Sequence, residues 1–383
     1  MNFSKPSLHA PVFTTSAHQS LVAEALVTAT TTLAPRRLPF AAKGASFGIP
    51  LTTVSLNSNF DAYINVGYRG GSGASLTSLL VDSGNSSLIV PDYNVVAGLP
   101  NFGSDYAILV DSIQEPWGCP AKILRGPIQI PTQSGDVYEI QGCVFYACTD
   151  ANQDGVRTAN FGTGCISPWP AIGAFTIQSP LSYNTTYPYA EFNYAPAATV
   201  MAIGKQPNTV GGSSLTLYQT MPPGYESFDI IKDCAWMSLI PRALTIGTTK
   251  TAWPGDYPSP IAMVDTGGGP VFLSDPEGYI YSASWPEKVP SPPWTSSSDC
   301  CQSVKDDLFI VLGDRNGSFS YRVDATNEPP SVQGLTLVMC KDCSYMMGNQ
   351  GMNIGGLSAL FNFIVIDYSL ARVGLKSKQP AVS

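Results

Sequence analysis

Two Asp-hydroxyl-Gly triplets are the residues of this chain whose types and spacing are best suited to catalysis. Asp82-Ser83-Gly84 ends the apolar run Leu79-Leu80-Val81, and Asp265-Thr266-Gly267 ends the apolar run Ile261-Ala262-Met263-Val264. The two triplets are separated by about the length of a domain, so the repeat indicates a duplicated unit with one triplet in each copy.

A pair of carboxyl groups can do acid and base chemistry without any other group. Two carboxylates a few ångströms apart cannot both ionise cheaply, so the pair shares one proton. Such a pair can take a proton from a water molecule and give one to a carbonyl oxygen. A single Asp-Ser/Thr-Gly is an ordinary turn at a strand end. Two in matching contexts favour a catalytic pair formed by Asp82 and Asp265.

Composition excludes several other kinds of site. The only histidines, His9 and His18, lie in the N-terminal segment, so the patterned body of the chain cannot build a Ser-His-Asp, Cys-His or histidine-zinc site. A net charge of −8 argues against a nucleic-acid partner. The nine cysteines lie between Cys119 and Cys343 without a repeated metal-binding spacing. They favour disulfide bonds in an oxidising compartment, or buried thiols, over a metal.

Strands must position the triplets. Only 13% of the residues are charged, while the chain has 35 Gly and 32 Pro, a balance that favours strands and tight turns over helices. No apolar run reaches the ~18 residues of a membrane span. The sequence therefore predicts an all-β protein with no membrane span. Apolar runs between turn residues predict strands at 51–56, 62–68, 76–82, 123–130, 136–146, 215–217, 243–248, 361–368 and 372–375.

The chain is expected to divide into three parts. Residues 1–45 are a tail or a pro-segment, whose basic residues can cover an acidic cleft until it is removed. Their short apolar run at 20–27 contains Glu24 and makes a poor signal-peptide core. Residues 46–200 form an N-terminal lobe that carries Asp82, and residues 201–383 form a C-terminal lobe that carries Asp265. Gly- and Pro-rich segments near 183–196 and 211–214 mark the crossing.

From about residue 48 to residue 378 the sequence resembles a divergent member of the pepsin-like aspartic peptidases. That family has an all-β, bilobal fold, with two related β-barrel-like lobes around a central cleft that a hairpin flap closes. The resemblance rests on both triplets and, in order, on the segments Ala62 to Gly67, Val90-Pro91, Phe161-Gly162-Thr163-Gly164, Tyr345-Met346-Met347-Gly348-Asn349 and Ile364 to Leu375.

The resemblance implies a role for each residue of the triplets. Asp82 and Asp265 are the pair that activates a water molecule. Ser83 and Thr266 hydrogen bond across the interface between the lobes, and Gly84 and Gly267 let main chain approach the carboxyls, where a side chain would block the contact.

Several neighbours of the triplets depart from the family. Asn85 replaces a hydroxyl residue that donates to the first Asp, although its amide can still donate. Gly268 stands where a second hydroxyl is usual, so Asp265 lacks one hydrogen bond to its charged form. Ile89 replaces the usual Trp, and Trp117-Gly118 stands in place of the flap's Tyr-Gly. These changes predict either a rebuilt flap that binds substrate through Trp117 and Gly118, or a Trp117 that is simply buried in a loop.

The resemblance predicts an aspartic endopeptidase, a hydrolase that cuts an extended peptide or protein substrate at acid pH. It implies no cofactor and no metal, a zymogen, a monomer, and a secreted or lumenal or vacuolar location. A disulfide bond is expected between Cys300 or Cys301 and Cys340 or Cys343. Two alternatives stay open on the same fold. One is a binding or inhibitory protein, and the other is an enzyme that uses the carboxyl pair on a small molecule.

Overall fold

Strands build the protein, as expected. Strands account for 56% and helices for 9% of the described residues, which confirms the all-β class. Residues 1–45, the expected tail or pro-segment, lie outside the described ranges. The computed structural model describes residues 46–56, 59–70, 76–115, 118–150, 159–165, 177–195, 212–230, 237–239, 241–246, 249–252, 261–267, 271–275, 301–303, 308–314, 317–323, 337–341, 351–355 and 359–378.

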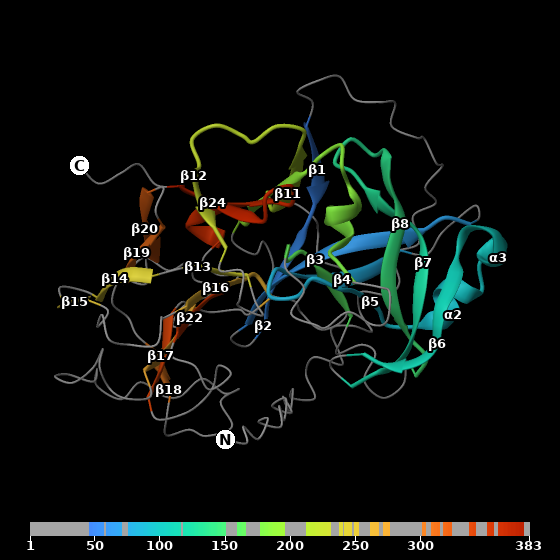
Figure 1. The fold of residues 1–383 in the computed structure, drawn as a ribbon, viewed down its shortest axis with the longest axis horizontal. Helices are drawn as coiled ribbons and strands as arrows, with labels where there is room; N and C mark the ends of the chain where they lie inside the picture. The colour runs from blue at the N-terminus through green and yellow to red at the C-terminus, as the bar shows by residue number, and fades with distance from the viewer. Residues whose placement is uncertain are drawn as a thin grey trace, which may run out of the picture.

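An eight-stranded sheet carries the first triplet and lies on the right in Figure 1. An additional pairing of β3 with β7 closes six of its strands, from β3 round to β7, into a barrel. The barrel holds Asp82 at the end of one of its own strands, β4. The strands in sheet order are β2 (Thr52–Leu56), β3 (Asn59–Tyr68), β4 (Thr77–Asp82), β9 (Asn160–Gly162), β5 (Leu88–Val90), β8 (Val137–Cys148), β7 (Pro120–Pro131) and β6 (Ala107–Gln114).

A six-stranded sheet carries the second triplet and repeats the pairing of the first barrel. Its six strands correspond one for one to β3, β4, β9, β5, β8 and β7, with the same alternation of antiparallel and parallel neighbours. The repeat suggested by the two triplets is therefore also a repeat of topology. The strands in order are β13 (Ser238–Leu239), β16 (Ile261–Asp265), β22 (Gly351–Gly355), β17 (Val271–Asp275), β21 (Leu337–Lys341) and β18 (Cys301–Ser303).

A third sheet joins distant parts of the chain, at the top centre of Figure 1. It contains strands from both sides of position 200, where the sequence was divided, and β10 lies between β11 and β23. In order they are β1 (Ser46–Pro50), β11 (Ser214–Tyr218), β10 (Tyr189–Asn193), β23 (Asn362–Asp367), β24 (Arg372–Ser377) and β12 (Glu226–Asp229).

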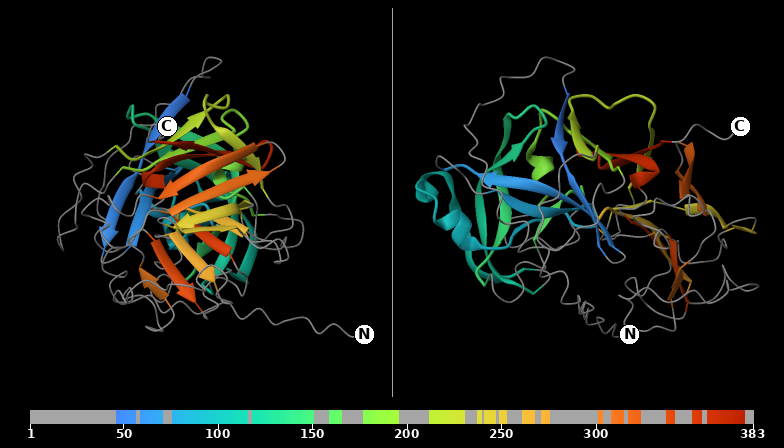
Figure 2. Two further views of the ribbon diagram at one scale, coloured as in Figure 1. Left: turned by 90° about the vertical axis from the view of Figure 1, so that its left-hand side faces the viewer. Right: turned by 180° about the vertical axis from the view of Figure 1, so that it is seen from behind.

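The fourth sheet lies at the side of the molecule opposite the helices α2 (Tyr93–Ala97) and α3 (Phe102–Asp105). Figure 1 and the right-hand view of Figure 2 both show this. Its strands are β15 (Thr249–Ala252), β14 (Pro241–Ile246), β19 (Leu308–Asp314) and β20 (Gly317–Val323). Helices are short: α2 (Tyr93–Ala97), capped by the Asp92 side chain, α3 (Phe102–Asp105), and the 3₁₀ turn η1 (Pro180–Tyr183). No helix in the described ranges is long and apolar enough to span a membrane.

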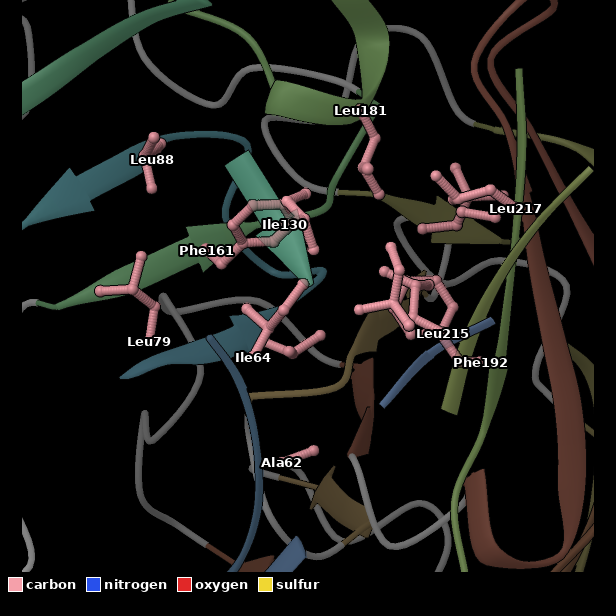
Figure 3. Close-up of a cluster of buried hydrophobic side chains, with 14 of the residues drawn as sticks. Ala62, Ile64, Leu79, Leu88, Ile130, Phe161, Leu181, Phe192, Leu215 and Leu217 are labelled. Atoms are coloured by element: carbon pink, nitrogen blue, oxygen red, sulfur yellow. The ribbon is translucent and has the colours of Figure 1, made fainter. Parts of the chain in front are cut away.

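The main core lies where the barrel meets the third sheet. Side chains alternate along β3, so that Ala62, Ile64 and Val66 point inward and are fully buried. Figure 3 shows Ala62 and Ile64 together with side chains that distant strands contribute to the same cluster. The barrel and the third sheet pack against this one core. Their packing holds β4, and therefore Asp82, in place relative to β10, β11 and β23. The labelled residues are Ala62, Ile64, Leu79, Leu88, Ile130, Phe161, Leu181, Phe192, Leu215 and Leu217.

Candidate active site

The two triplets meet. Each forms the turn that ends a strand, β4 for Asp82 and β16 for Asp265. A Cβ added at Gly84 would lie 2.7 Å from Cγ of Asp265, and one added at Gly267 would lie 2.7 Å from Cγ of Asp82. Each glycine therefore faces the carboxyl of the opposite triplet at a distance that only a residue without a side chain allows. The expected close approach of main chain to both carboxyls is present.

Ser83 and Thr266 lock the two turns together. Ser83 N–H donates to Thr266 Oγ1 at 3.0 Å, and Thr266 N–H donates to Ser83 Oγ at 2.9 Å. Each hydroxyl then donates to a carbonyl of the opposite strand, Ser83 Oγ to Val264 at 2.9 Å and Thr266 Oγ1 to Val81 at 3.2 Å. Both residues are buried. The four bonds have near twofold symmetry and fix the positions of both aspartates.

The carboxyls hydrogen bond to each other and to nearby main chain. Gly84 N–H donates to Asp82 Oδ1 at 2.8 Å, and Gly267 N–H donates to Asp265 Oδ1 at 3.1 Å. Asp82 also hydrogen bonds to the side chain of Asp265. Burial, followed by the charge of Asp265, raises the pKa of Asp82 well above its ordinary value. These carboxyls can share a proton.

The segment around β9 passes behind the Asp82 turn, as the Phe161-to-Gly164 motif suggested. β9 runs parallel to β4, with Asp82 opposite Gly162. A Cβ at Gly162 would lie 2.3 Å from the main-chain nitrogen of Ser87, so the strand fits only with glycine there. Thr163 N–H donates to the carbonyl of Asp82 at 2.7 Å, and Gly162 N–H donates to the carbonyl of Ser87 at 2.9 Å. The turn is thus held from behind.

The matching segment in the second half is β22, and the earlier interpretation of residues 345–349 was wrong about its position. β22 runs parallel to β16 with Asp265 opposite Gly355. Residues 345–349 lie outside the described ranges. The registers make Asn160-Phe161-Gly162 and Asn353-Ile354-Gly355 equivalent in the two copies.

Asn160 is a site residue that the sequence analysis missed. Its amide Nδ2 donates to Asp82 Oδ2 at 2.7 Å. This contact lowers the pKa of Asp82 against the larger effects that raise it. The available signal was the Asn-apolar-Gly pattern that occurs at both 160–162 and 353–355.

Asn85 does not act as the donor to Asp82. Its Oδ1 accepts the N–H of Ser87 at 2.8 Å, and its buried Nδ2 has no hydrogen-bond partner among the residues described. The amide is therefore held by its own turn, and Asn160 supplies the donor from a different strand.

The expected flap corresponds to the hairpin of β6 and β7. Gly118 lies in its turn with φ of +101°, which favours glycine, and donates its N–H to the carbonyl of Glu115 at 2.9 Å. Ile89 is fully buried in a cluster under this hairpin that includes Cys119 and Ile123. Trp117 and Gly268 lie outside the described residues.

The site thus combines two hydrogen-bonded carboxyls, a rigid support for each, and a glycine-lined approach. No group of three or more His, Cys, Asp or Glu side chains that could hold a metal gathers in the ranges described. Comparison with known proteins found no family model and no curated protein that matches the chain.

Proposed function

We propose that this protein is a pepsin-like aspartic endopeptidase that hydrolyses peptide bonds with Asp82 and Asp265. The observation that carries the proposal is the pair of reciprocal bonds between Ser83 and Thr266, which holds two aspartates from equivalent turns against each other. A lone structural turn has no need of a partner 183 residues away.

The proposed fold is bilobal, with one aspartate from each lobe. Its support is the repeated strand order around β4 and around β16, together with the sheet that mixes strands from both halves. An extended peptide is proposed to lie across the carboxyl pair under the β6–β7 hairpin, without cofactor or metal.

The reaction needs one proton on the pair. One carboxylate removes a proton from a water molecule, whose oxygen bonds to the peptide carbonyl carbon while the other carboxyl gives its proton to the carbonyl oxygen. The product is a neutral gem-diol. The first carboxyl then protonates the nitrogen, the second takes back a hydroxyl proton, and the C–N bond breaks. The pair ends with the proton where it began.

A binding or inhibitory protein is the second candidate, and the altered position of Asn85 is the observation that favours it. Asn85 turns its oxygen to Ser87 and leaves the family's donor position unused. Against it stand both carboxyls and the replacement donor Asn160.

Digestion of a mixed peptide library from pH 2 to pH 8 tests the proposal. We expect cleavage at acid pH by the full chain and its loss in Asp82→Asn and Asp265→Asn, each checked for folding by circular dichroism. A folded chain that cuts no peptide at any pH would reject the peptidase. Cleavage that persists in either variant would reject the carboxyl pair. Tight binding of a statine-type mimic without cleavage would favour the binding protein.

A further inference from the structure

We propose that Asn160 is a positioning residue that orients the Asp82 carboxyl and stabilises its ionised form. The inference rests on the proposed function, because it assigns Asn160 a role within that reaction.

The contact itself is direct. Asn160 lies in β9, two residues before the point where Gly162 passes Asp82, and is 7% exposed. Its Nδ2 donates to Asp82 Oδ2 at 2.7 Å, while its Oδ1 has no hydrogen-bond partner within the described ranges. Burial of an amide is costly unless it is hydrogen bonded, and a bond to a charged acceptor offsets more of that cost than one to a neutral acceptor.

An amide N–H can only donate, so the contact discriminates between the two states of Asp82. An ionised carboxylate accepts at both oxygens, whereas protonation turns one oxygen into a hydroxyl that accepts less well. Gly84 N–H occupies Oδ1 and Asn160 occupies Oδ2, so both oxygens of Asp82 receive a donor. Both contacts therefore stabilise the ionised form of Asp82, against the burial and the Asp265 charge that raise its pKa.

Few other groups act on the charge of Asp82. The titratable neighbours within the described ranges are the Asp265 carboxyl at the end of β16, the Tyr194 phenol after β10, and, further along the same network, the Asp61 carboxyl on β3. None of these three neighbours carries a positive charge that could stabilise the ionised form of Asp82. Only Asn160, and less strongly Gly84 N–H, lower the pKa of Asp82.

Asn160→Leu tests the inference, because leucine keeps the size of the side chain and removes the donor. Carboxyl pKa values are measured by NMR in protein labelled with ¹³C-aspartate, with the Asp82 signal assigned from its absence in Asp82→Asn. We expect the pKa of Asp82 to rise by about one pH unit, as loss of one bond to a charged group predicts. The acid limb of kcat/KM should move to higher pH by the same amount.

Asn65→Leu is the matched control, since Asn65 is exposed on β3. It should leave the pKa of Asp82 unchanged. If Asn160→Leu does not fold, Asn160→Asp keeps the shape and places a second negative charge beside Asp82, which should raise that pKa further.

An unchanged or lower pKa of Asp82 in folded Asn160→Leu or Asn160→Asp would overturn the inference, even in an active peptidase. A risen pKa in a chain that cuts no peptide would keep the role of Asn160 and reject the peptidase. The NMR measurement therefore separates the two proposals.

Discussion

Ser83 and Thr266, 183 residues apart, each donate a main-chain N–H to the other's hydroxyl, at 3.0 Å and 2.9 Å. Each hydroxyl donates a hydrogen bond to a carbonyl of the opposite strand. Both turns are thereby held by one closed set of bonds, and neither aspartate can move without breaking part of it.

Thr266→Val and Ser83→Ala test this set. Each variant removes one hydroxyl and leaves two buried main-chain groups with fewer partners, so each should lower the free energy of unfolding by about 2–3 kcal/mol. Because the two hydroxyls hold the same pair of turns together, the double variant should lose less than the sum of the single losses. Urea unfolding measures this. Thr266→Ser keeps the hydroxyl and should lose less than Thr266→Val, and strict additivity in the double variant would contradict the coupling.

Gly84→Ala and Gly267→Ala should impair the reaction directly. A new Cβ at either position lies 2.7 Å from the carboxyl carbon of the opposite aspartate and must displace it. We expect kcat/KM for a peptide substrate to fall by about 100-fold, the cost of misplacing a reacting group by roughly 1 Å. Gly103→Ala, in α3 with no heavy atom within 4 Å of the added Cβ, is the control and should keep full activity. Full activity in Gly84→Ala would show that the approach tolerates a side chain.

The Asp61 carboxyl should make the protein less stable as the pH rises. Burial raises the pKa of Asp61 from 3.8 to about 6, against a smaller opposite effect of the Tyr63 hydroxyl at 3.3 Å. Below pH 4 both folded and unfolded chains hold the proton. Above it the unfolded chain releases the proton first, and stability is lost until the pH passes about 6.

Asp61→Asn should remove that part of the pH dependence. Between pH 4 and pH 7 the wild type should lose at most about 3 kcal/mol more than the variant, measured from urea midpoints. The raised pKa of Asp82 acts in the same direction and remains in the variant. Equal losses in the two proteins would show that Asp61 holds no extra proton in the folded state.

A Cys301–Cys340 disulfide is favoured over the other three pairings expected from the sequence. Cys301 in β18 and Cys340 in β21 are direct partners in the antiparallel register, and residues so placed have the Cα separation that a disulfide needs. Cys300 and Cys343 lie outside the described ranges. In protein folded with oxidised glutathione, a non-reducing peptide map should contain the linked peptides. Alkylation of both cysteines without prior reduction would contradict the pairing.

Local patterns predicted the three longest strands and both aspartates. Apolar runs at 62–68, 123–130 and 136–146 became β3, β7 and β8 with small changes at their ends. The triplets were found because turn chemistry and the preceding apolar run are local in sequence.

Asn160 and β22 could not be placed in the same way. Asn160 reaches Asp82, which lies 78 residues earlier in the chain, only because β9 pairs with β4. No local pattern in the sequence specifies the register of that pairing. β22 contains two glycines and a polar residue in five positions, which gives it too weak an apolar pattern to be found as a strand. The pairing of β1 with β11 in the third sheet is likewise decided by tertiary packing.

The parallel pairing of β4 with β9 and of β16 with β22 also determines when the site can form during biosynthesis. A ribosome releases Asp82 and the strands of its barrel first, and contacts between distant segments form last. The partner of Ser83 arrives 183 residues later, and β22 ends only at Gly355. A growing chain therefore holds a single, unpaired triplet over the 183 residues between Ser83 and Thr266. Any hydrolysis that depends on both aspartates is withheld from the nascent protein and its neighbours until β22 has been made.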